Sequence, residues 1–367
     1  MEKISILVDA HCFDGAGQGI VSYIQGLYAE LLKNPSLDIT FVCSKPETVY
    51  KAFGEHAKLV QIPQSNFLYR LCFFFPKLLR SGAYQYAHFQ YILPFVLSRK
   101  VKYITTIHDI IPIDFPKLYS VLYRLKVSVL FQRAAQKSDI ICTVSEYSKK
   151  RIAARFNIDE RKIVVTPNAV KTVFDGEQKN RVQPIARPYF LYVSRIEERK
   201  NHLLLLKAFA HTAFFKDFDV VFIGKNSSKN KSLFRFFHAL SRDVQERVHF
   251  VSDISDEDLI SYYQNASLFV YPSIAEGFGI PPLEAAVMGC KVVCSNSTAM
   301  SDFSFFAPYL FSPDSESELI EKIKMALSDE TYPYEKIRWQ ISERYSWEKS
   351  ASQLWNRIQV ELVGGGV

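Results

Sequence analysis

Cysteine pairs, long apolar runs and a leader-like start are all missing from this sequence of 367 residues. The six cysteines form no CxxC pair, and several lie in apolar strand-like runs, which predicts buried thiols in a reducing compartment. The longest apolar region, Phe67 to Leu79, is interrupted by Arg70, Pro76 and Lys77 and is shorter than the roughly 20 residues of a membrane-spanning helix. Its three consecutive phenylalanines beside basic residues leave two interpretations, a buried helix or a segment that dips into a lipid interface.

The start and the charge of the chain bear on its location and partners. The sequence opens on the strand-like run Ile4–Val8 without a basic region or cleavage site, so we expect a cytoplasmic protein. Lys and Arg total 45 against 38 Asp and Glu, a modest excess that favours phosphates or acidic lipids as partners. No zinc-ligand spacing or RNA-binding aromatic signature is present, so we expect no nucleic acid. The basic clusters at 99–102 and 149–151 are interpreted as solvated faces, with peripheral contact to an anionic membrane, at its inner face, as the alternative.

Short β-branched runs alternate with longer amphipathic ones, a pattern typical of βα units around parallel sheets, so the predicted fold class is α/β. The length predicts two domains. Between Lys171 and Pro188 the apolar periodicity stops, which indicates a linker. The predicted parts are an amino-terminal Rossmann-like domain (1–175), a linker (176–188), a carboxyl-terminal domain with a second parallel sheet (189–345) and a final helix and tail (346–367) that packs back on the first domain. The predicted strands span 4–8, 39–43, 59–62, 103–107, 140–144, 163–166, 190–193, 220–223, 248–251, 268–271 and 292–294.

Two such sheets in tandem leave a cleft at the carboxyl ends of their strands, where ligands of these folds bind. Candidate residues are therefore those that directly follow a strand. A loop with Gly17 and Gly19 joins the first strand to the first helix and would let backbone amides approach a phosphate, although a plain turn explains the spacing equally well. His108 and Asp109 follow the strand at 103–107 and are predicted to point into the cleft, with a structural histidine and a chain-turning aspartate as the alternative.

A basic run from Ser194 to Asn201 follows the first strand of the second half and opens a helix. Arg195 can grip two phosphate oxygens at once and Lys200 adds a point charge, a combination that suits a diphosphate. The alternative is a charged, solvated loop.

The segment from Glu276 to Glu284 is the most specific motif. Gly277 and Gly279 permit a tight loop, and the two prolines that follow Ile280 suit the first turn of a helix whose amides would bind phosphate. A carboxylate beside bound phosphate cannot favour the anion, so Glu276 and Glu284 are expected to meet sugar and ribose hydroxyls. A merely structural loop would not need both carboxylates.

Taken together, these motifs resemble the retaining glycosyltransferases of family four, which have the GT-B fold. The resemblance covers nearly the whole chain in the same order, through the glycine loop, His108-Asp109, Thr166-Pro167-Asn168, Arg195 to Asn201, and Glu276 to Glu284. It implies two Rossmann-like domains whose parallel sheets face each other across a cleft. It also implies transfer of a hexose from a nucleoside-diphosphate sugar to a glycan acceptor, expected to be lipid-linked, in synthesis of bacterial capsule or lipopolysaccharide O-antigen.

The resemblance also implies a role for each motif. Arg195 and Lys200 would hold the donor diphosphate and stabilise the departing nucleotide. Glu276 would contact hydroxyls of the donor sugar, Glu284 the ribose, and His108 the sugar near the reaction centre. The other implied contacts to the donor are Gly17, Gly19, Ser194, Gly277, Phe278, Gly279 and Ile280, and Asp109 is a candidate for acceptor binding or positioning. No metal and no cofactor are implied, because cationic side chains and helix amides replace them.

The sequence departs from the family pattern at Ser194 and Ala169, which replace glycines, and in the first loop, which lacks the commonest glycine pair. None of these changes is interpreted as loss of activity. Two other enzyme classes with the same two-sheet fold, a nucleotide-sugar epimerase and a phosphorylase, remain as alternatives. An inactive, membrane-associated assembly partner is the alternative of another class, but such a protein would usually have lost one of His108, Arg195, Lys200 and Glu276.

Overall fold

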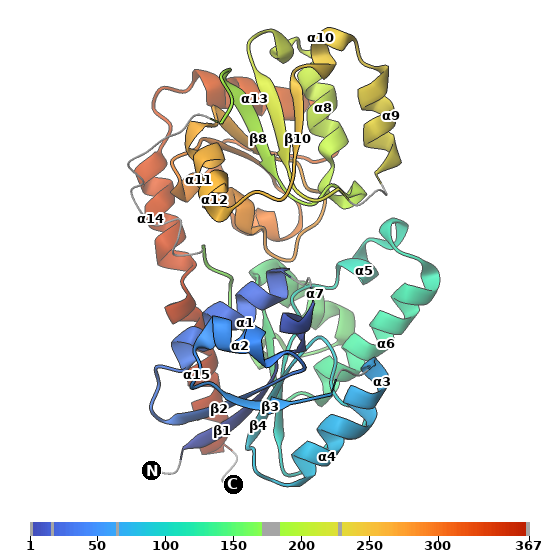
Figure 1. The fold of residues 1–367 in the computed structure, drawn as a ribbon, viewed down its shortest axis with the longest axis vertical. Coiled ribbons are helices and arrows are strands. Elements are labelled where there is room, and N and C mark those ends of the chain that lie inside the picture. The colour runs from blue at the N-terminus through green and yellow to red at the C-terminus, as the bar shows by residue number, and fades with distance from the viewer. Residues whose placement is uncertain (1–2, 16–17, 64–65, 171–183, 227–229, 365–367) are drawn as a thin grey trace. The chain divides into compact units, whose positions relative to one another are not determined.

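The computed structural model describes residues 3–15, 18–63, 66–170, 184–226 and 230–364. They form two compact units, the first from Met1–Ala169 with Tyr345–Val367 and the second from Val170–Arg344 (Figure 1). Gly17 and most of the predicted linker lie outside the described residues.

The first unit is built on a seven-stranded parallel sheet in the order β3-β2-β1-β4-β5-β6-β7. Six of these strands are confirmed to within two residues, and β4 was not predicted. The strands are β1 (Ile4–Asp9), β2 (Leu37–Cys43), β3 (Lys58–Gln61), β4 (Tyr86–Gln90), β5 (Lys102–Thr106), β6 (Ile140–Thr143) and β7 (Ile163–Val165). The helices are α1 (Gln18–Leu31), α2 (Pro46–Phe53), α3 (Phe67–Tyr69), the π-helix η2 (Arg70–Phe74), α4 (Phe75–Arg80), α5 (Ile111–Asp114), α6 (Val121–Lys137), α7 (Glu146–Phe156) and α15 (Trp347–Gly364).

The final helix α15 belongs to the first unit, where it packs on α1, β6 and β7. A Cβ atom at Gly26 of α1 would lie 2.0 Å from the ring of Trp347, so only glycine allows the two helices to approach this closely. The Ser350 hydroxyl donates to the Pro167 carbonyl over 2.8 Å. A helix was predicted over this stretch, and the contacts show which face of it is buried.

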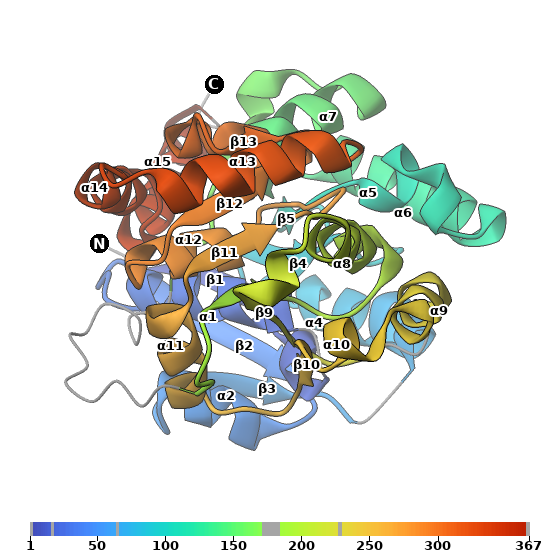
Figure 2. The same cartoon turned by 90° about the horizontal axis from the view of Figure 1, so that it is seen from above.

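The second unit repeats the design with a six-stranded parallel sheet in the order β10-β9-β8-β11-β12-β13. Helix α8 packs with α9 and α13, and α12 packs with α11 and α14, so helices cover both faces of the sheet (Figure 2). The α/β class is confirmed. The strands are β8 (Tyr189–Val193), β9 (Asp219–Ile223), β10 (Val248–Val251), β11 (Leu268–Tyr271), β12 (Val292–Ser295) and β13 (Leu310–Phe311). The helices are η6 (Glu198–Lys200), α8 (His202–His211), α9 (Lys231–Ala239), α10 (Arg242–Gln245), α11 (Asp256–Asn265), α12 (Ile280–Val287), α13 (Glu316–Ser328) and α14 (Tyr334–Arg344).

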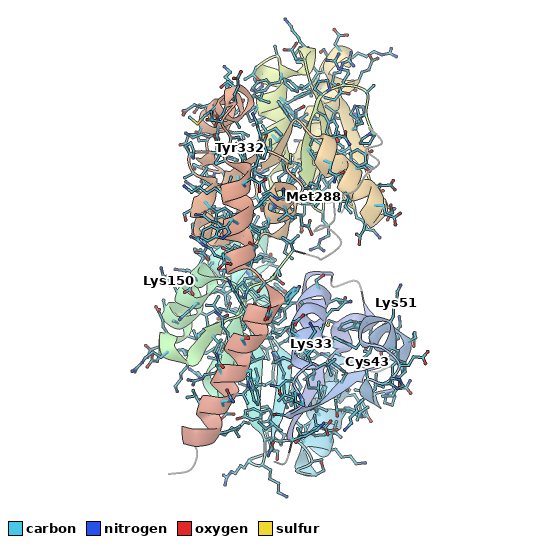
Figure 3. All side chains as sticks on the ribbon, turned by 90° about the vertical axis from the view of Figure 1, so that its left-hand side faces the viewer. Lys33, Cys43, Lys51, Lys150, Met288 and Tyr332 are labelled. Atoms are coloured by element: carbon cyan, nitrogen blue, oxygen red, sulfur yellow. The ribbon has the colours of Figure 1, made fainter. Side chains whose placement is uncertain are left out.

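The thiols and the surface charges follow the predicted pattern. All six cysteines are unpaired, and all but Cys72 are buried. Cys43 lies inside the first unit, whereas the side chains of Lys33, Lys51 and Lys150 project outward (Figure 3). Within the described ranges, no helix combines the length and the apolar character that crossing a membrane requires.

Candidate functional site

The second unit has its topological switch point between β8 and β11, the neighbouring strands from which the sheet grows in opposite directions. Ligands of open parallel sheets bind in the crevice outside the carboxyl ends of such strands. The chain after β8 carries Ser194, Arg195 and Lys200, and the chain after β11 carries Glu276. Two of the motifs that the sequence singled out therefore start at the same edge of the same sheet.

The structure brings Lys200 and Glu276 into direct contact at this point. The Lys200 ammonium lies 2.6 Å from Oε1 of Glu276, and Nη1 of Arg199 lies 2.9 Å from Oε2. The hydroxyls of Ser273 and Tyr271 donate to the same Oε1 over 2.6 and 3.0 Å. Glu276 is only 8% exposed, so its carboxylate is a buried charge held by two cations and two hydroxyls.

The charges in this cluster follow from burial and from its neighbours. Burial alone would raise the pKa of Glu276, but the charges of Arg199 and Lys200 and the hydrogen bonds outweigh it and hold that pKa well below its usual range. Burial lowers the pKa of Lys200, and the Glu276 charge opposes that shift. Glu276 is therefore ionised at neutral pH and can only accept hydrogen bonds.

Neighbouring residues on β8, α8 and the loop after β9 hold Lys200 and Ser194 in place. The Tyr192 hydroxyl donates to the Lys200 carbonyl over 2.6 Å, and the Ser194 hydroxyl lies 3.2 Å from Nε2 of His202. A Cβ atom at Gly224, which has φ +149°, would lie 2.0 Å from the Ser194 carbonyl oxygen. Glycine at 224 is thus required for the loops after β8 and β9 to lie side by side.

Arg195 lies apart from this buried cluster. Its side chain is 68% exposed, and its guanidinium is 3.5 Å from the carboxylate of Glu197. An exposed guanidinium with one loose ionic contact can turn toward an incoming anion at little cost. The structure therefore supplies two kinds of cation, a fixed ammonium at Lys200 and an adaptable guanidinium at Arg195.

The motif after β11 forms a loop and the start of α12. Gly279 adopts φ +101°, a left-handed conformation that favours glycine, and it caps the helix. Pro281 and Pro282 have no N–H, and the Leu283 amide donates to the Gly279 carbonyl as the first bond of the helix, so an anion at this end would meet the amides of Gly279 and Ile280.

The remaining members of this motif lie beside that helix start. The buried Glu284 accepts a hydrogen bond from the Tyr263 hydroxyl of α11 over 3.0 Å. Phe278 is buried with its ring edge against Phe303, at 5.7 Å between ring centres, and Gly277 lies between Phe278 and Glu276. The loop backbone is therefore fixed by packing on both sides of Gly277.

In the first unit, His108 lies two residues after the end of β5, and Gln90 ends the neighbouring strand β4. Nε2 of His108 lies 2.8 Å from Oε1 of Gln90, and the edge of the Tyr23 ring packs on the imidazole. Burial lowers the pKa of His108 to about 3, so the ring is neutral at physiological pH. Because Nε2 donates to the Gln90 oxygen, Nδ1 is left as a hydrogen-bond acceptor.

A chain of buried polar side chains backs this pair. His88 lies on β4 with the Tyr28 hydroxyl 2.6 Å from Nδ1 and the Thr106 hydroxyl 2.7 Å from Nε2. The Tyr23 hydroxyl links Thr106 to Thr166, at 3.2 and 2.7 Å. Such a network fixes side chains in one arrangement.

The other candidates of the first unit are Asp109 and Gly19. Asp109 accepts a hydrogen bond from the Ile111 amide over 3.0 Å, as a residue that turns the chain into α5 does, and from the Tyr91 hydroxyl over 3.4 Å. Gly19 is exposed in the first turn of α1, and a Cβ atom there would meet nothing within 4 Å. The packing of the unit itself therefore does not require glycine at 19.

Sequence reasoning missed Arg199, Ser273, Tyr271 and Gln90. Arg199 stands in the basic run beside Lys200, but a charged residue in a loop carries no sign of burial. Ser273, three residues before Glu276, is a common type of residue and gives no signal. Gln90 ends a strand that was itself not predicted.

Two protein-family models match the chain in succession. The model described as Glycosyltransferase Family 4 matches residues 17–174, and the model described as Glycosyl transferases group 1 matches residues 175–345. The matches adjoin without overlap, and the second contains the Glu276 cluster.

Among curated relatives, the O-antigen chain mannosyltransferase B of Escherichia coli is 26% identical over 281 residues, which are 74% of this chain and 72% of the relative. The O-antigen chain mannosyltransferase RfbU of Salmonella typhimurium is 26% identical over 60% of this chain and 59% of its own length. An N-acetylgalactosaminyltransferase of Campylobacter jejuni, whose name gives a diphospho-undecaprenol-linked acceptor, is 24% identical over 58% of this chain and 56% of its own length.

Solved structures show the same fold at low sequence identity. A glycosyltransferase from Rickettsia africae aligns with a TM-score of 0.73 and 16% identity over 97% of this chain and 98% of its own. HepE of Anabaena, solved with UDP-glucose, has a TM-score of 0.73 and 13% identity over 97% of this chain and 100% of its own. These solved structures show the shared fold. The two family models, which together match residues 17–345, show that the chain belongs to the family 4 glycosyltransferases, with a group 1 domain as its second half.

Proposed function

We propose that this chain is a retaining, metal-independent hexosyltransferase that moves a sugar from a nucleoside-diphosphate donor to a lipid-linked glycan in O-antigen or related surface-polysaccharide synthesis. The observation that carries the proposal is the buried Glu276–Lys200–Arg199 cluster at the switch point of the group 1 domain. The names of the Escherichia coli and Salmonella relatives support the pathway and make mannose the first donor sugar to test. The name of the Campylobacter relative supports a lipid-linked acceptor.

The cations of the second unit are proposed to hold the donor diphosphate. Lys200 provides a fixed positive charge in a buried place, where a charge acts strongly because little water screens it. Arg195, which is exposed, closes on the phosphates from outside, and Ser194 and the loop amides of Gly277, Gly279 and Ile280 complete the contacts. As the bond from sugar to phosphate breaks, the growing negative charge of the departing nucleotide is met by cations already in position.

Glu276 is proposed to hold the donor sugar rather than to attack it. Its Oε1 already accepts three hydrogen bonds, from Lys200, Ser273 and Tyr271, whereas Oε2 accepts from Arg199 and has room for another donor. A sugar hydroxyl is a donor of the right kind, and Glu284 is proposed to do the same for the ribose. The acceptor then attacks from the face that the phosphate leaves, and that phosphate takes the acceptor proton.

From the first unit, His108 is proposed to contact the sugar near the reaction centre. Its neutral ring offers Nδ1 as an acceptor for a sugar hydroxyl, which fits the role that family resemblance gives it. Gly19 is proposed to lie close to the diphosphate, and Asp109 to position the acceptor. The protein is proposed to act in the cytoplasm, in peripheral contact with an anionic membrane.

A thermal-shift screen tests the proposal. Purified protein is heated with UDP, GDP, ADP and dTDP in EDTA, and then with the nucleotide sugars of whichever diphosphate stabilises it. We expect one diphosphate to raise Tm, and Lys200→Ala to remove that rise while Lys207→Ala, a lysine on α8 of the same unit, keeps it. No stabilisation by any of the four, or equal stabilisation of Lys200→Ala, would contradict the proposed donor site.

A further inference from the structure

The first unit carries an unusual concentration of exposed apolar side chains. Within the described ranges, ten of the fifteen exposed large apolar residues lie in three short segments, η2 with α3, the loop at 95–96 and the first half of α6. We call them the α3–α6 surface. Its members are Leu68, Tyr69, Phe73, Phe95, Val96, Val121, Leu122, Tyr123, Leu125 and Val129.

The first six residues of α6 show the anomaly most clearly. The buried residues of this helix begin only at Val127, so its first turns cover no core. Leu122 is 82% exposed and Leu125 is 60% exposed, which is unusual for leucine in a helix of a folded domain. In a soluble protein, a group of exposed apolar side chains of this kind marks a place where something else binds.

The three segments touch one another, so they form one surface. The Lys126 ammonium of α6 lies over the Phe67 ring of α3, 5.3 Å from its centre, and Phe67 packs edge-on against Phe95 at 6.3 Å. Arg133 of α6 donates to the carbonyls of Pro94 and Phe95 over 2.8 and 3.0 Å. Helices α3, α4 and α6 lie on the same side of the first unit (Figure 1).

This part of the chain also holds its positive charge. Residues 56–138 contain twelve Lys and Arg but only two acidic residues, Asp109 and Asp114, which gives a net charge of +10. The whole chain carries +7, so all other residues together sum to −3. On α3, η2, the adjoining α4 and the whole of α6, the charged residues are Arg70, Lys77, Arg80, Arg124, Lys126, Arg133 and Lys137, all of them cations.

We propose that the α3–α6 surface docks on an anionic lipid bilayer, with Leu122 and Leu125 entering the interface and the cations meeting lipid phosphates. The inference rests on the proposed function in one respect, because a lipid-linked acceptor explains why the enzyme would need a bilayer. Exposed apolar side chains beside cations, on helices that carry no carboxylate of their own, are the composition that interfacial helices show. In the region Phe67–Leu79, Leu71, Phe75 and Leu79 are buried, whereas Phe73 is 66% exposed and available for such contact.

Vesicle co-sedimentation of the full chain tests the surface without donor or acceptor. Vesicles of equal parts phosphatidylglycerol and phosphatidylcholine are compared with vesicles of phosphatidylcholine alone. We expect the wild-type protein to bind the anionic vesicles at least tenfold more strongly, with affinity that falls as salt rises. Leu122→Ser with Leu125→Ser, and separately Lys77→Glu with Lys126→Glu, should each lower binding about tenfold or more.

Matched control variants test whether the loss of vesicle binding is specific to the α3–α6 surface. Val360→Ser with Leu362→Ser changes two exposed apolar residues elsewhere in the first unit, and Lys51→Glu with Lys150→Glu changes two outward lysines (Figure 3). Both controls should bind vesicles like the wild type. Because the substituted side chains are exposed, every variant should melt within a few degrees of the wild type.

Two results would overturn the inference. One is equal binding of the wild type to both kinds of vesicle, or none to either. The other is that the double variant Leu122→Ser with Leu125→Ser binds vesicles as well as the wild type does. If that variant were also monomeric where the wild type is dimeric, the surface would be assigned to contact with a second copy of the chain. Calorimetry with nucleoside diphosphates reports on the donor site separately, so a failed docking surface and a failed proposed function can be told apart.

Discussion

Glu276→Gln removes one charge from the cluster and keeps the shape of the side chain. In the wild type the carboxylate faces Lys200 at 2.6 Å and Arg199 at 2.9 Å, and all three side chains are at least four-fifths buried. With glutamine, two buried cations lose their shared counter-charge, and such a change costs about 3–5 kcal/mol of unfolding free energy. The pKa of Lys200 falls further without the Glu276 charge, so loss of its proton limits the cost. We therefore expect the free energy of unfolding to fall by an amount at the lower end of that range.

The same substitution should act in the opposite direction on diphosphate binding. Removal of a negative charge about 6 Å from a phosphate gains at most about 3 kcal/mol at an effective dielectric of 20. Deprotonation of Lys200 reduces this gain, so we expect the Kd for the preferred diphosphate to stay equal or to tighten by up to about tenfold. Lys200→Met should weaken it about tenfold or more, and both variants should lose sugar transfer.

Urea unfolding and titration calorimetry measure the two effects. The matched control is Glu246→Gln, which makes the same chemical change at an exposed ion pair with Arg242 in the same unit and should cost less than about 0.5 kcal/mol. A Kd for Glu276→Gln that rises tenfold would refute the assignment of Glu276 to the sugar. Wild-type stability of this variant would refute the buried-charge argument itself.

Three further predictions follow from the two units. Gln90→Glu places a carboxylate 2.8 Å from His108 and should raise the pKa of that ring by roughly two. The acid limb of the pH–rate profile should therefore move to higher pH. Gln90→Asn should lower the rate without moving that limb. His88, His108 and His202 all have a pKa of about 3 in the fold, below that of an unfolded histidine, so the unfolded chain binds the extra protons. Stability in urea should therefore fall by about 3.6 kcal/mol as pH drops from 6 to 5, whereas a flat profile would count against neutral histidines. Gly224→Ala should cost at least about 1–3 kcal/mol, because φ +149° and the Ser194 carbonyl both exclude a Cβ atom, and an unchanged Tm would contradict this.

The regular part of the fold could be predicted because its apolar pattern is strong. Eleven strands consist of short β-branched or aromatic runs, and all were found within two residues of their predicted bounds. Strand β13 (Leu310–Phe311) was not predicted because it has only two residues. Strand β4 escaped because it reads Tyr-Ala-His-Phe-Gln, where two polar residues interrupt the apolar run. Those two, His88 and Gln90, are buried in the network behind His108. The failure of the pattern thus marks a place where buried polar groups hold His108, the side chain that we propose to contact the donor sugar.

The sequence predicted the motifs of the candidate site, but not which of their side chains contact one another. Position after a strand pointed to Lys200 and Glu276, and the structure joins them in one ion cluster. Nothing in the spacing distinguishes Arg199, which is buried against Glu276, from Arg195, which is exposed, because both lie in the same basic run with only three residues between them. Which basic residue of such a run turns inward depends on tertiary packing, which a local pattern does not contain. The α6 part of the α3–α6 surface escaped for the same reason, since an apolar helix in a sequence indicates burial by default.

The most direct test of the account is sugar transfer by the purified chain. The nucleotide sugar that stabilises the protein is mixed in EDTA with a lipid-linked glycan fraction, and the glycan mass, the released nucleotide and the anomeric configuration of the new bond are measured. We predict that the glycan gains one sugar residue for each nucleoside diphosphate released, with retained configuration, and that Glu276→Gln gives neither. Conversion of the donor into its epimer, or a requirement for inorganic phosphate, would contradict the account and favour an epimerase or a phosphorylase.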